Sequence, residues 1–328
     1  MKELVRKMLP DSFINLIRNY NKGKKTRFIN EMNKRGFIFD KKSNYYSPLP
    51  DYELLMKNKE RWNKPSELIG INWSLDELKN NFAELHNKYY HEVLELPTFI
   101  ELENMGFGVG FTPFDSYLLY YMIREHKPKR YFEIGSGTST YFCHLASQKN
   151  VSLGFNATEI NCIEPYPWDL LKTIQPINLT VSEVQSVPFD YFNRIEDGDF
   201  LFIDSTHIVK LDGDVPYLFL EILPRINKNI FIHIHDIAFP YTIPYPSDFW
   251  ISDRKYETED QLKIPMYWTE GMLLQALLTN NPLYSIHQSM PMIRYYDNEY
   301  LTSLVPETSK ITNPYHNFSS IWLRKSVK

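Results

Sequence analysis

Five candidate strands, each a short run that contains apolar residues, alternate with stretches of helical spacing in the middle of the chain. The runs cover residues 130–134, 157–163, 179–185, 199–204 and 229–235, and helical spacing appears over 139–148, 169–174 and 217–225. Strands that alternate with helices predict an α/β fold with a doubly wound parallel sheet and helices on both faces. In such a sheet, ligands bind beyond the carboxyl ends of the strands.

In the first third of the chain, segments with helical spacing of apolar residues are interrupted by segments rich in turn-forming residues. In "WSLDELKNNFAELHNKYYHEV", Ser74 can cap a helix and Glu77 can complete a capping box. The apolar stripe of this helix is Leu75, Leu78, Phe82 and Leu85. We expect a mainly helical N-terminal extension or cap over residues 1–110 and a sheet domain over residues 111–328.

A later amphipathic helix is expected in "YWTEGMLLQALLTNN". Its core-facing residues are predicted to be Met272, Leu273, Ala276 and Leu277. Trp268 and Glu270, just before and at its start, are expected at the edge of a pocket.

The N-terminal segment is basic and amphipathic. Residues 1–35 hold 10 Lys and Arg against 3 Asp and Glu, which gives a local charge of +7 and leaves −11 for the remainder of the chain. Leu4, Met8 and Leu9, followed by Phe13, Ile14 and Ile17, recur at helical spacing. An amphipathic helix that docks on its own domain is favoured over a contact with a membrane surface.

Composition narrows the class of protein. The chain has 328 residues, is 43% hydrophobic and carries a net charge of −4, which argues against disorder and against nucleic-acid binding through overall positive charge. Its 2 cysteines build no disulfide framework, which suits a reducing compartment and predicts a cytoplasmic protein. The expected partner is a small molecule or a glycan.

The glycine-rich stretch "RYFEIGSGTST" follows the first predicted strand. Gly135, Ser136 and Gly137 form a turn that lets the backbone approach a ligand. A dinucleotide fingerprint would have glycine in place of Thr140, so an NAD(P)-dependent oxidoreductase is the weaker alternative. Glu133 can face a positively charged cofactor, and Glu164, at the end of the next strand, can accept hydrogen bonds from a ribose diol.

Four motifs in order carry a resemblance to a known family: "YFEIGSGTSTYF", "CIEPYP", "FLFIDSTHIVKLDGDVPYLFLEILPRI" and "IFIHIHDIAFPY". Over roughly residues 112–290 the chain resembles class I S-adenosylmethionine-dependent methyltransferases, in particular the bacterial group called methyltransferase family 24. The resemblance implies a Rossmann-like, mostly parallel seven-stranded sheet and S-adenosylmethionine as the cofactor. It also implies that Gln185 and Ser186 lie near the adenine.

Two later strands end in polar clusters that can build an active site. Asp204 and His207 follow one strand, and His235 and Asp236 end the next, so neighbouring strands would gather them at one rim. The resemblance extends to catechol-type metal-dependent methyltransferases, which have polar residues at these places. Here His207 stands where that group has lysine, and His235 stands where it has an acid.

These residues predict a base and a candidate metal site. His207 is the first candidate for the base that deprotonates a hydroxyl acceptor, His235 is the second, and Asp204 orients the imidazole or holds a metal. Asp204, His235 and Asp236 are the candidate ligands of a divalent ion such as Mg²⁺ or Mn²⁺, and the mixed His/Asp set suits manganese better than magnesium.

The sequence therefore predicts a methyltransferase that modifies a hydroxyl of a sugar, a glycan or a small metabolite, with metal assistance as an open question. Two alternatives remain: the NAD(P)-dependent oxidoreductase, and a catalytically degenerate methyltransferase-fold domain that serves as a binding module.

Overall fold

The computed structural model describes residues 11–35, 44–107, 110–252, 256–257, 263–311 and 318–327. It divides the chain into two compact units, Met1–Lys59 and Glu60–Lys328. Leu4, Met8, Leu9 and the basic residues around them lie outside the described residues, as do the side chains of Phe13, Ile14 and Ile17. The predicted division into an extension and a sheet domain at residue 110 stays a prediction.

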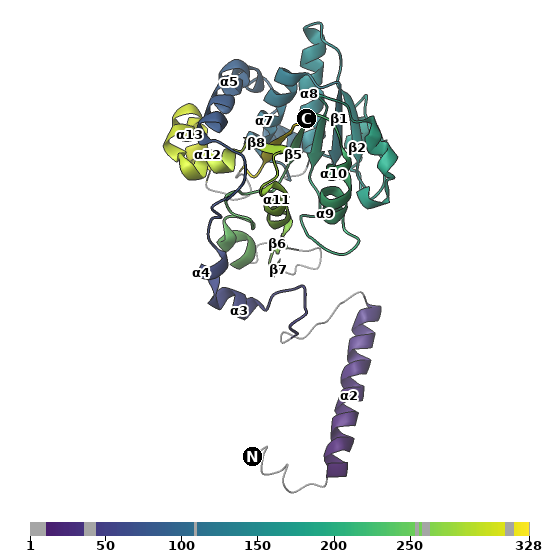
Figure 1. Cartoon of the computed structure of the whole chain (residues 1–328). Coiled ribbons are helices and arrows are strands. Elements are labelled where there is room, and N and C mark those ends of the chain that lie inside the picture. The colour runs from purple at the N-terminus through teal and green to yellow at the C-terminus, as the bar shows by residue number, and fades with distance from the viewer. Residues whose placement is uncertain are drawn as a thin grey trace. The chain divides into compact units, whose positions relative to one another are not determined.

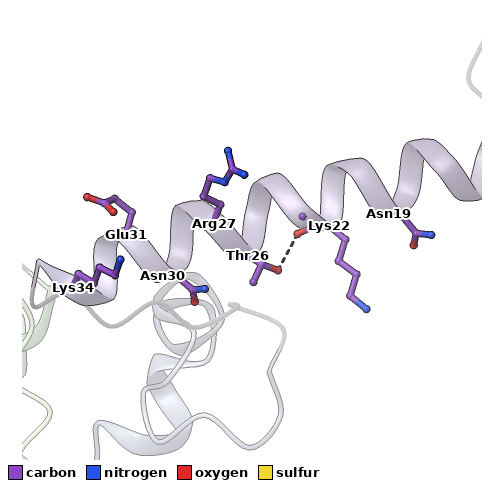
Figure 2. Close-up of a pocket in the computed structure, with 8 residues that line it drawn as sticks. Asn19, Lys22, Thr26, Arg27, Asn30, Glu31 and Lys34 are labelled. Carbon is purple, nitrogen blue, oxygen red and sulfur yellow. Dashed lines mark hydrogen bonds between the residues drawn. The ribbon is translucent and has the colours of Figure 1, made fainter.

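The first unit contains α2 (Asp11–Lys34) and α3 (Tyr52–Lys57) (Figure 1). Figure 2 shows polar side chains along α2, among them Lys22, Arg27 and Lys34. The hollow that these side chains line belongs to the surface of one helix and holds none of the predicted site residues. Among the described residues, none of the helices combines the length and the apolar character needed to cross a membrane.

A seven-stranded sheet forms the centre of the second unit, with the strand order β3-β2-β1-β4-β5-β9-β8. Strands β1 to β5 run parallel, and β9 is antiparallel to both β5 and β8. The strands are β1 (Arg130–Ile134), β2 (Glu159–Ile163), β3 (Asn178–Thr180), β4 (Phe200–Ile203), β5 (Ile230–Ile234), β8 (Tyr284–Gln288) and β9 (Ile321–Lys325). This is a Rossmann-like doubly wound sheet, and it confirms the predicted α/β fold with a mostly parallel seven-stranded sheet.

The helices of the second unit include several one-turn and 3-10 segments. They are α4 (Lys59–Trp62), α5 (Leu75–Val93), α6 (Phe99–Met105), α7 (Pro113–His126), α8 (Thr138–Ser152), α9 (Asp214–Pro216), α10 (Leu223–Arg225), α11 (Glu270–Leu278), α12 (Met290–Tyr296) and α13 (Asn298–Leu304). The 3-10 helices are η1 (Leu171–Thr173), η2 (Val184–Ser186), η3 (Phe189–Arg194) and η6 (Pro306–Lys310). The π-helical segments are η4 (Tyr217–Ile222) and η5 (Asp248–Ser252), and β6 (Tyr256–Glu257) pairs with β7 (Lys263–Ile264).

Both faces of the sheet are covered. On one face, the His126 ring of α7 contacts Phe200 and Phe231, with centroids 5.8 and 4.5 Å apart. On the other face, Phe132 contacts Tyr191 of η3. Because successive strand residues point to opposite faces, these contacts place α7 and η3 on opposite sides of the sheet.

Helix α5 begins as the sequence predicts, because the Ser74 side chain accepts a hydrogen bond from the Glu77 backbone N–H. Its residues Leu78, Phe82 and Leu85 are buried in the same core as the strands. A buried ion pair connects α5 to α7: Arg124 Nε donates to Glu92 Oε2 at 2.7 Å. Helix α5 is therefore part of the packing of the second unit.

Candidate active site

The carboxyl ends of β1, β2 and β4 meet at a cleft of about 240 Å³. Its lining comprises Gly110, Phe111, Gly135, Ser136, Gly137, Thr138, Ser139, Glu164, Tyr166, Trp168 and Asp204. Four of the predicted cofactor residues, Gly135, Ser136, Gly137 and Glu164, thus lie together in one cleft. Strand order explains this, because β1 pairs with β2 on one side and with β4 on the other.

Glu164 links the second strand to the glycine turn. Its carboxylate accepts hydrogen bonds from the backbone N–H groups of Ser136, at 3.1 Å, and Tyr166, at 2.8 Å. Each carboxylate oxygen keeps a further lone pair, and the side chain is only partly buried. Glu164 can therefore accept hydrogen bonds from a bound diol while it holds the turn in place.

Glu133 lies beneath the turn and does not line the cleft. It is fully buried and accepts hydrogen bonds from Ser139 Oγ at 2.7 Å, from Thr140 Oγ1 and from Tyr131 Oη at 3.2 Å. Burial raises the pKa of this carboxyl to about 7, although the hydroxyl donors act in the opposite direction. Any effect of Glu133 on a cofactor would thus be exerted through the turn that it supports.

Gln185 and Ser186 lie in η2, after the short strand β3, and are not among the residues that line the cleft. The Gln185 side chain donates to Glu183 Oε2 at 3.1 Å. Their predicted place near the adenine stays a prediction. The sequence did not predict Phe111, Tyr166 and Trp168 as residues that line the cleft. Tyr166 and Trp168 could have been expected there, because they follow Glu164 within four residues.

A second group of polar residues lies next to this cleft, at the ends of β4 and β5. His207 Nε2 lies 3.4 Å from Asp204 Oδ1 and 3.3 Å from Asp236 Oδ2. His235 Nδ1 lies 3.5 Å from Asp204 Oδ1 and 3.6 Å from Asp236 Oδ2. The structure therefore brings together all four residues that the sequence selected at this rim.

Two further carboxylates complete the group. On one side, Asp115 Oδ2 of α7 lies 3.6 Å from His235 Nε2. On the other, Glu270 Oε2 of α11 is 2.8 Å from His207 Nδ1, within hydrogen-bond distance. The sequence predicted Glu270 only at the edge of a pocket. It did not predict Asp115, because an acid in the first turn of a helix is common and indicates no site.

Charge, more than burial, determines the protonation of this group. Burial would lower the pKa of His207, but contacts with Asp204 and Glu270 and the charge of Asp236 raise it well above its usual value. Burial acts on His235 in the same direction, and the charges of Asp236 and Asp204 likewise raise its pKa. For Asp204, burial opposes ionisation, yet His235 and His207 hold its pKa below its ordinary value.

His233 does not belong to this group. It stacks on Trp322 with ring centroids 4.1 Å apart, and burial holds its pKa well below the usual value. It lies on a sheet face and is a packing residue.

The arrangement contains one set of atoms suited to a metal ion. Ligand atoms of Asp204, His207 and Asp236 all lie within 4.8 Å of one another. Two carboxylates and one imidazole suit Mn²⁺, Fe²⁺ or Zn²⁺ better than Mg²⁺. The sequence predicted His235 as the histidine ligand, whereas this set contains His207. The two ring nitrogens of His235 are buried without a hydrogen bond, and its role as a ligand stays a prediction.

Comparison with known proteins gives distant likenesses. No family model matches the chain. An uncharacterized protein of Archaeoglobus fulgidus is 26% identical over 165 residues, which are 47% of this chain and 72% of that protein. Among solved structures, the O-methyltransferase from Bacillus cereus in complex with SAH is 13% identical, covers 73% of this chain and 96% of its own, and has a TM-score of 0.40.

A second solved structure, the SAH-bound methyltransferase PaMTH1 of Podospora anserina, is 14% identical. It covers 86% of this chain and 99% of its own, with a TM-score of 0.34. Likeness at this level identifies no substrate.

Proposed function

We propose that this protein is an S-adenosylmethionine-dependent methyltransferase that transfers a methyl group to a hydroxyl oxygen. The observation that carries the proposal is the shared rim: the glycine turn and Glu164 form one cleft, and Asp204 belongs both to its lining and to the His/carboxylate group beside it. A cofactor in the cleft would hold its reactive end next to a candidate base.

The charge balance of the rim supports a positively charged ligand. Four carboxylates, those of Asp115, Asp204, Asp236 and Glu270, surround two imidazoles, those of His207 and His235. If every carboxylate is ionised, negative charge exceeds positive charge by about two units even when both imidazoles are protonated. A sulfonium cofactor, a divalent metal ion or both would balance this excess.

The chemistry requires one proton transfer and one methyl transfer. The acceptor hydroxyl loses its proton as its oxygen attacks the methyl carbon, and the sulfonium sulfur leaves with the electron pair of the broken C–S bond. His207 Nε2 faces the two rim carboxylates, which raise the pKa of this imidazole. A positively charged cofactor or metal ion bound at the rim would lower that pKa again, and Nε2 of the neutral imidazole is our candidate for the atom that takes the proton. Asp204 and Asp236 would stabilise the imidazolium that forms.

The same rim fits a divalent metal ion, with Asp204, His207 and Asp236 as ligands. When bound, such an ion would lower the pKa of the acceptor hydroxyl and orient it. His207 Nε2 can serve as a ligand or as the base but not as both at once, so metal binding decides between these two roles.

The acceptor that we propose is a sugar, a glycan or a small metabolite with a free hydroxyl. Tyr241 lines a small hollow together with His207 and Asp236, and its ring stacks on that of Tyr245 with centroids 4.0 Å apart. Aromatic faces of this kind contact the apolar face of a sugar ring or another flat group. The hollow itself measures only about 10 Å³, so a hydroxylated ligand would contact it from outside, with its hydroxyl toward the candidate base.

Calorimetric titration of the purified protein with S-adenosylhomocysteine, and separately with NADP⁺, tests the proposal. We expect binding of S-adenosylhomocysteine and none of NADP⁺, with an effect of added Mn²⁺ if the rim holds a metal. Binding of NADP⁺ alone would replace the proposal with an oxidoreductase. Binding of S-adenosylhomocysteine without turnover of any hydroxylated acceptor would favour a binding module.

A further inference from the structure

The start of α11 holds the backbone of His207 in place. The N–H groups of Thr269 and Glu270 both donate to the carbonyl oxygen of His207, at 2.9 and 3.1 Å. Val209 N–H donates to Thr269 Oγ1 at 2.8 Å. His207 has a φ of 61°, a left-handed conformation that is costly for a residue with a side chain. Three hydrogen bonds between residues 207–209 and the distant start of α11 thus hold His207 in an unusual backbone geometry.

Glu270 adds a side-chain contact to this backbone clamp. It is only 1% exposed, and its Oε2 lies 2.8 Å from His207 Nδ1. Its other oxygen, Oε1, is buried without a hydrogen bond. Burying a carboxylate is costly unless it is well paired, and the imidazole of His207 is the group that this carboxylate meets. Packing alone would be served better by an apolar residue.

The contact determines which nitrogen of His207 is available for chemistry. An ionised carboxylate can only accept a hydrogen bond, so with Glu270 ionised Nδ1 carries the proton and donates it to Glu270. Nε2, which lies 3.3 and 3.4 Å from Asp236 and Asp204, is then the nitrogen on the side of the rim. The ring of Trp268, with its centroid 4.7 Å from that of His207, packs against the imidazole and restricts its rotation.

We propose that Glu270 is a positioning residue that fixes the tautomer and orientation of His207, so that Nε2 is the atom that acts at the rim. The role of Nε2 in methyl transfer rests on the proposed function. The hydrogen bond between Glu270 and His207 can be tested without an acceptor or a cofactor. A carboxylate behind an imidazole serves the same purpose whether the imidazole is a base or a metal ligand.

NMR of the full chain labelled with ¹⁵N-histidine tests the hydrogen bond directly. In the wild type we expect a solvent-protected Nδ1–H signal from His207, assigned by its loss in His207→Asn. The signal should disappear in Glu270→Ala and in Glu270→Met, which fills the same space without an acceptor. It should persist in Glu270→Gln, whose amide oxygen still accepts.

His233 provides an internal control for folding, because it is stacked on Trp322 away from Glu270 and its ring signals should not move. An unprotonated Nδ1 in the wild type, or an unchanged His207 signal in a folded Glu270→Met variant, would overturn the proposal. If Glu270→Ala does not fold, the pair Glu270→Met and Glu270→Gln still decides.

Binding and turnover separate this inference from the proposed function. Glu270→Met should bind S-adenosylhomocysteine within about twofold of the wild type, since Glu270 does not line the cofactor cleft. With an identified acceptor, its kcat should fall by about 10- to 100-fold while the KM for S-adenosylmethionine stays nearly constant. Failure of the wild type to bind S-adenosylhomocysteine would remove the proposed function and leave the NMR result standing. Parallel losses in kcat and cofactor affinity would show a merely structural role for Glu270.

Discussion

The backbone carbonyl oxygen of Asp204 occupies the space that a side chain on Gly135 would need. A Cβ added to Gly135 would lie 1.9 Å from this oxygen, and Gly135 itself has a φ of 79°. The close approach brings the end of β1 against the end of β4, because Asp204 N–H also donates to the carbonyl of Ile134 at 2.8 Å. The proposed cofactor cleft and the His/carboxylate group beside it are thus joined through one glycine.

Gly135→Ala is expected to destabilise the protein by at least about 3 kcal/mol, because backbone must move on both strands. Gly137→Ala is the matched control: a Cβ there meets nothing within 4 Å. This control should have the same midpoint urea concentration of unfolding as the wild type. It should bind S-adenosylhomocysteine more weakly than the wild type, since Gly137 lines the cleft. Urea unfolding and calorimetry measure the two effects, and equal stability of the two variants would contradict the steric argument.

Glu164→Ala should weaken binding of S-adenosylhomocysteine by about 10- to 100-fold, since hydrogen bonds to a charged group contribute about 1.5–3 kcal/mol. His207→Ala should change that affinity by less than about threefold, because His207 does not line the cleft. Isothermal titration of both variants measures the difference. Similar losses in the two variants would mean that the ribose contact was assigned to the wrong residue.

Glu133 should make stability depend on pH. Its pKa is raised to about 7 in the folded protein, so between about pH 4.5 and 7 the folded state keeps a proton that the unfolded state releases. The contribution of this group to stability is therefore complete below about pH 4.5 and is lost as the pH rises to 7. The loss is on the order of 3 kcal/mol.

Urea unfolding of the wild type and Glu133→Gln at pH 5 and pH 8 measures this dependence. The variant should gain stability relative to the wild type as the pH rises, because glutamine has no proton to release. A difference between the two proteins that stays constant with pH would show that Glu133 is ionised throughout.

The buried pair of Arg124 and Glu92 should stabilise the contact between α5 and α7. Its side chains are only 5% and 10% exposed. Arg124→Met removes the cation from the Glu92 carboxylate, to which Tyr120 Oη still donates at 2.9 Å, and should cost about 3–5 kcal/mol. Arg124→Met combined with Glu92→Leu should recover most of that loss. Thermal unfolding of the single and double variants gives the coupling. A double variant no more stable than Arg124→Met alone would argue against a penalty from the unpaired charge.

The sheet and the glycine turn could be predicted because their signals are local. The predicted run 130–134 coincides with β1, since its apolar residues Tyr131, Phe132 and Ile134 lead directly into the turn at Gly135. Residues 179–185 were expected as a strand, but β3 covers only Asn178–Thr180. As an edge strand with a partly exposed surface, it has weak alternation and its end is poorly marked.

Helix α11 shows where a local pattern fails. Leu273 and Leu277 pack against the core as predicted, although they are only partly buried, and the fully buried leucines are Leu274 and Leu278. Met272 is 48% exposed and Ala276 is also exposed, so the prediction was wrong for these two residues. The buried face of α11 consists of Glu270, Leu274 and Leu278, which are four residues apart. Because this face begins with an acid, the sequence pattern did not mark it as apolar. The contact that buries this acid comes from His207, 63 residues earlier, and no local pattern reveals such a distant partner.

The order of strands also sets the order in which the sheet can be completed. Strand β8 precedes β9 in the chain, yet β8 joins the sheet only by pairing with β9, which lies between β8 and β5. During synthesis on the ribosome, β8 must therefore wait until residues 321–325 have been made, and until then the edge of β5 is open. A nascent chain stalled before residue 321 should expose this edge to a protease or a chaperone, and the released chain of 328 residues should not.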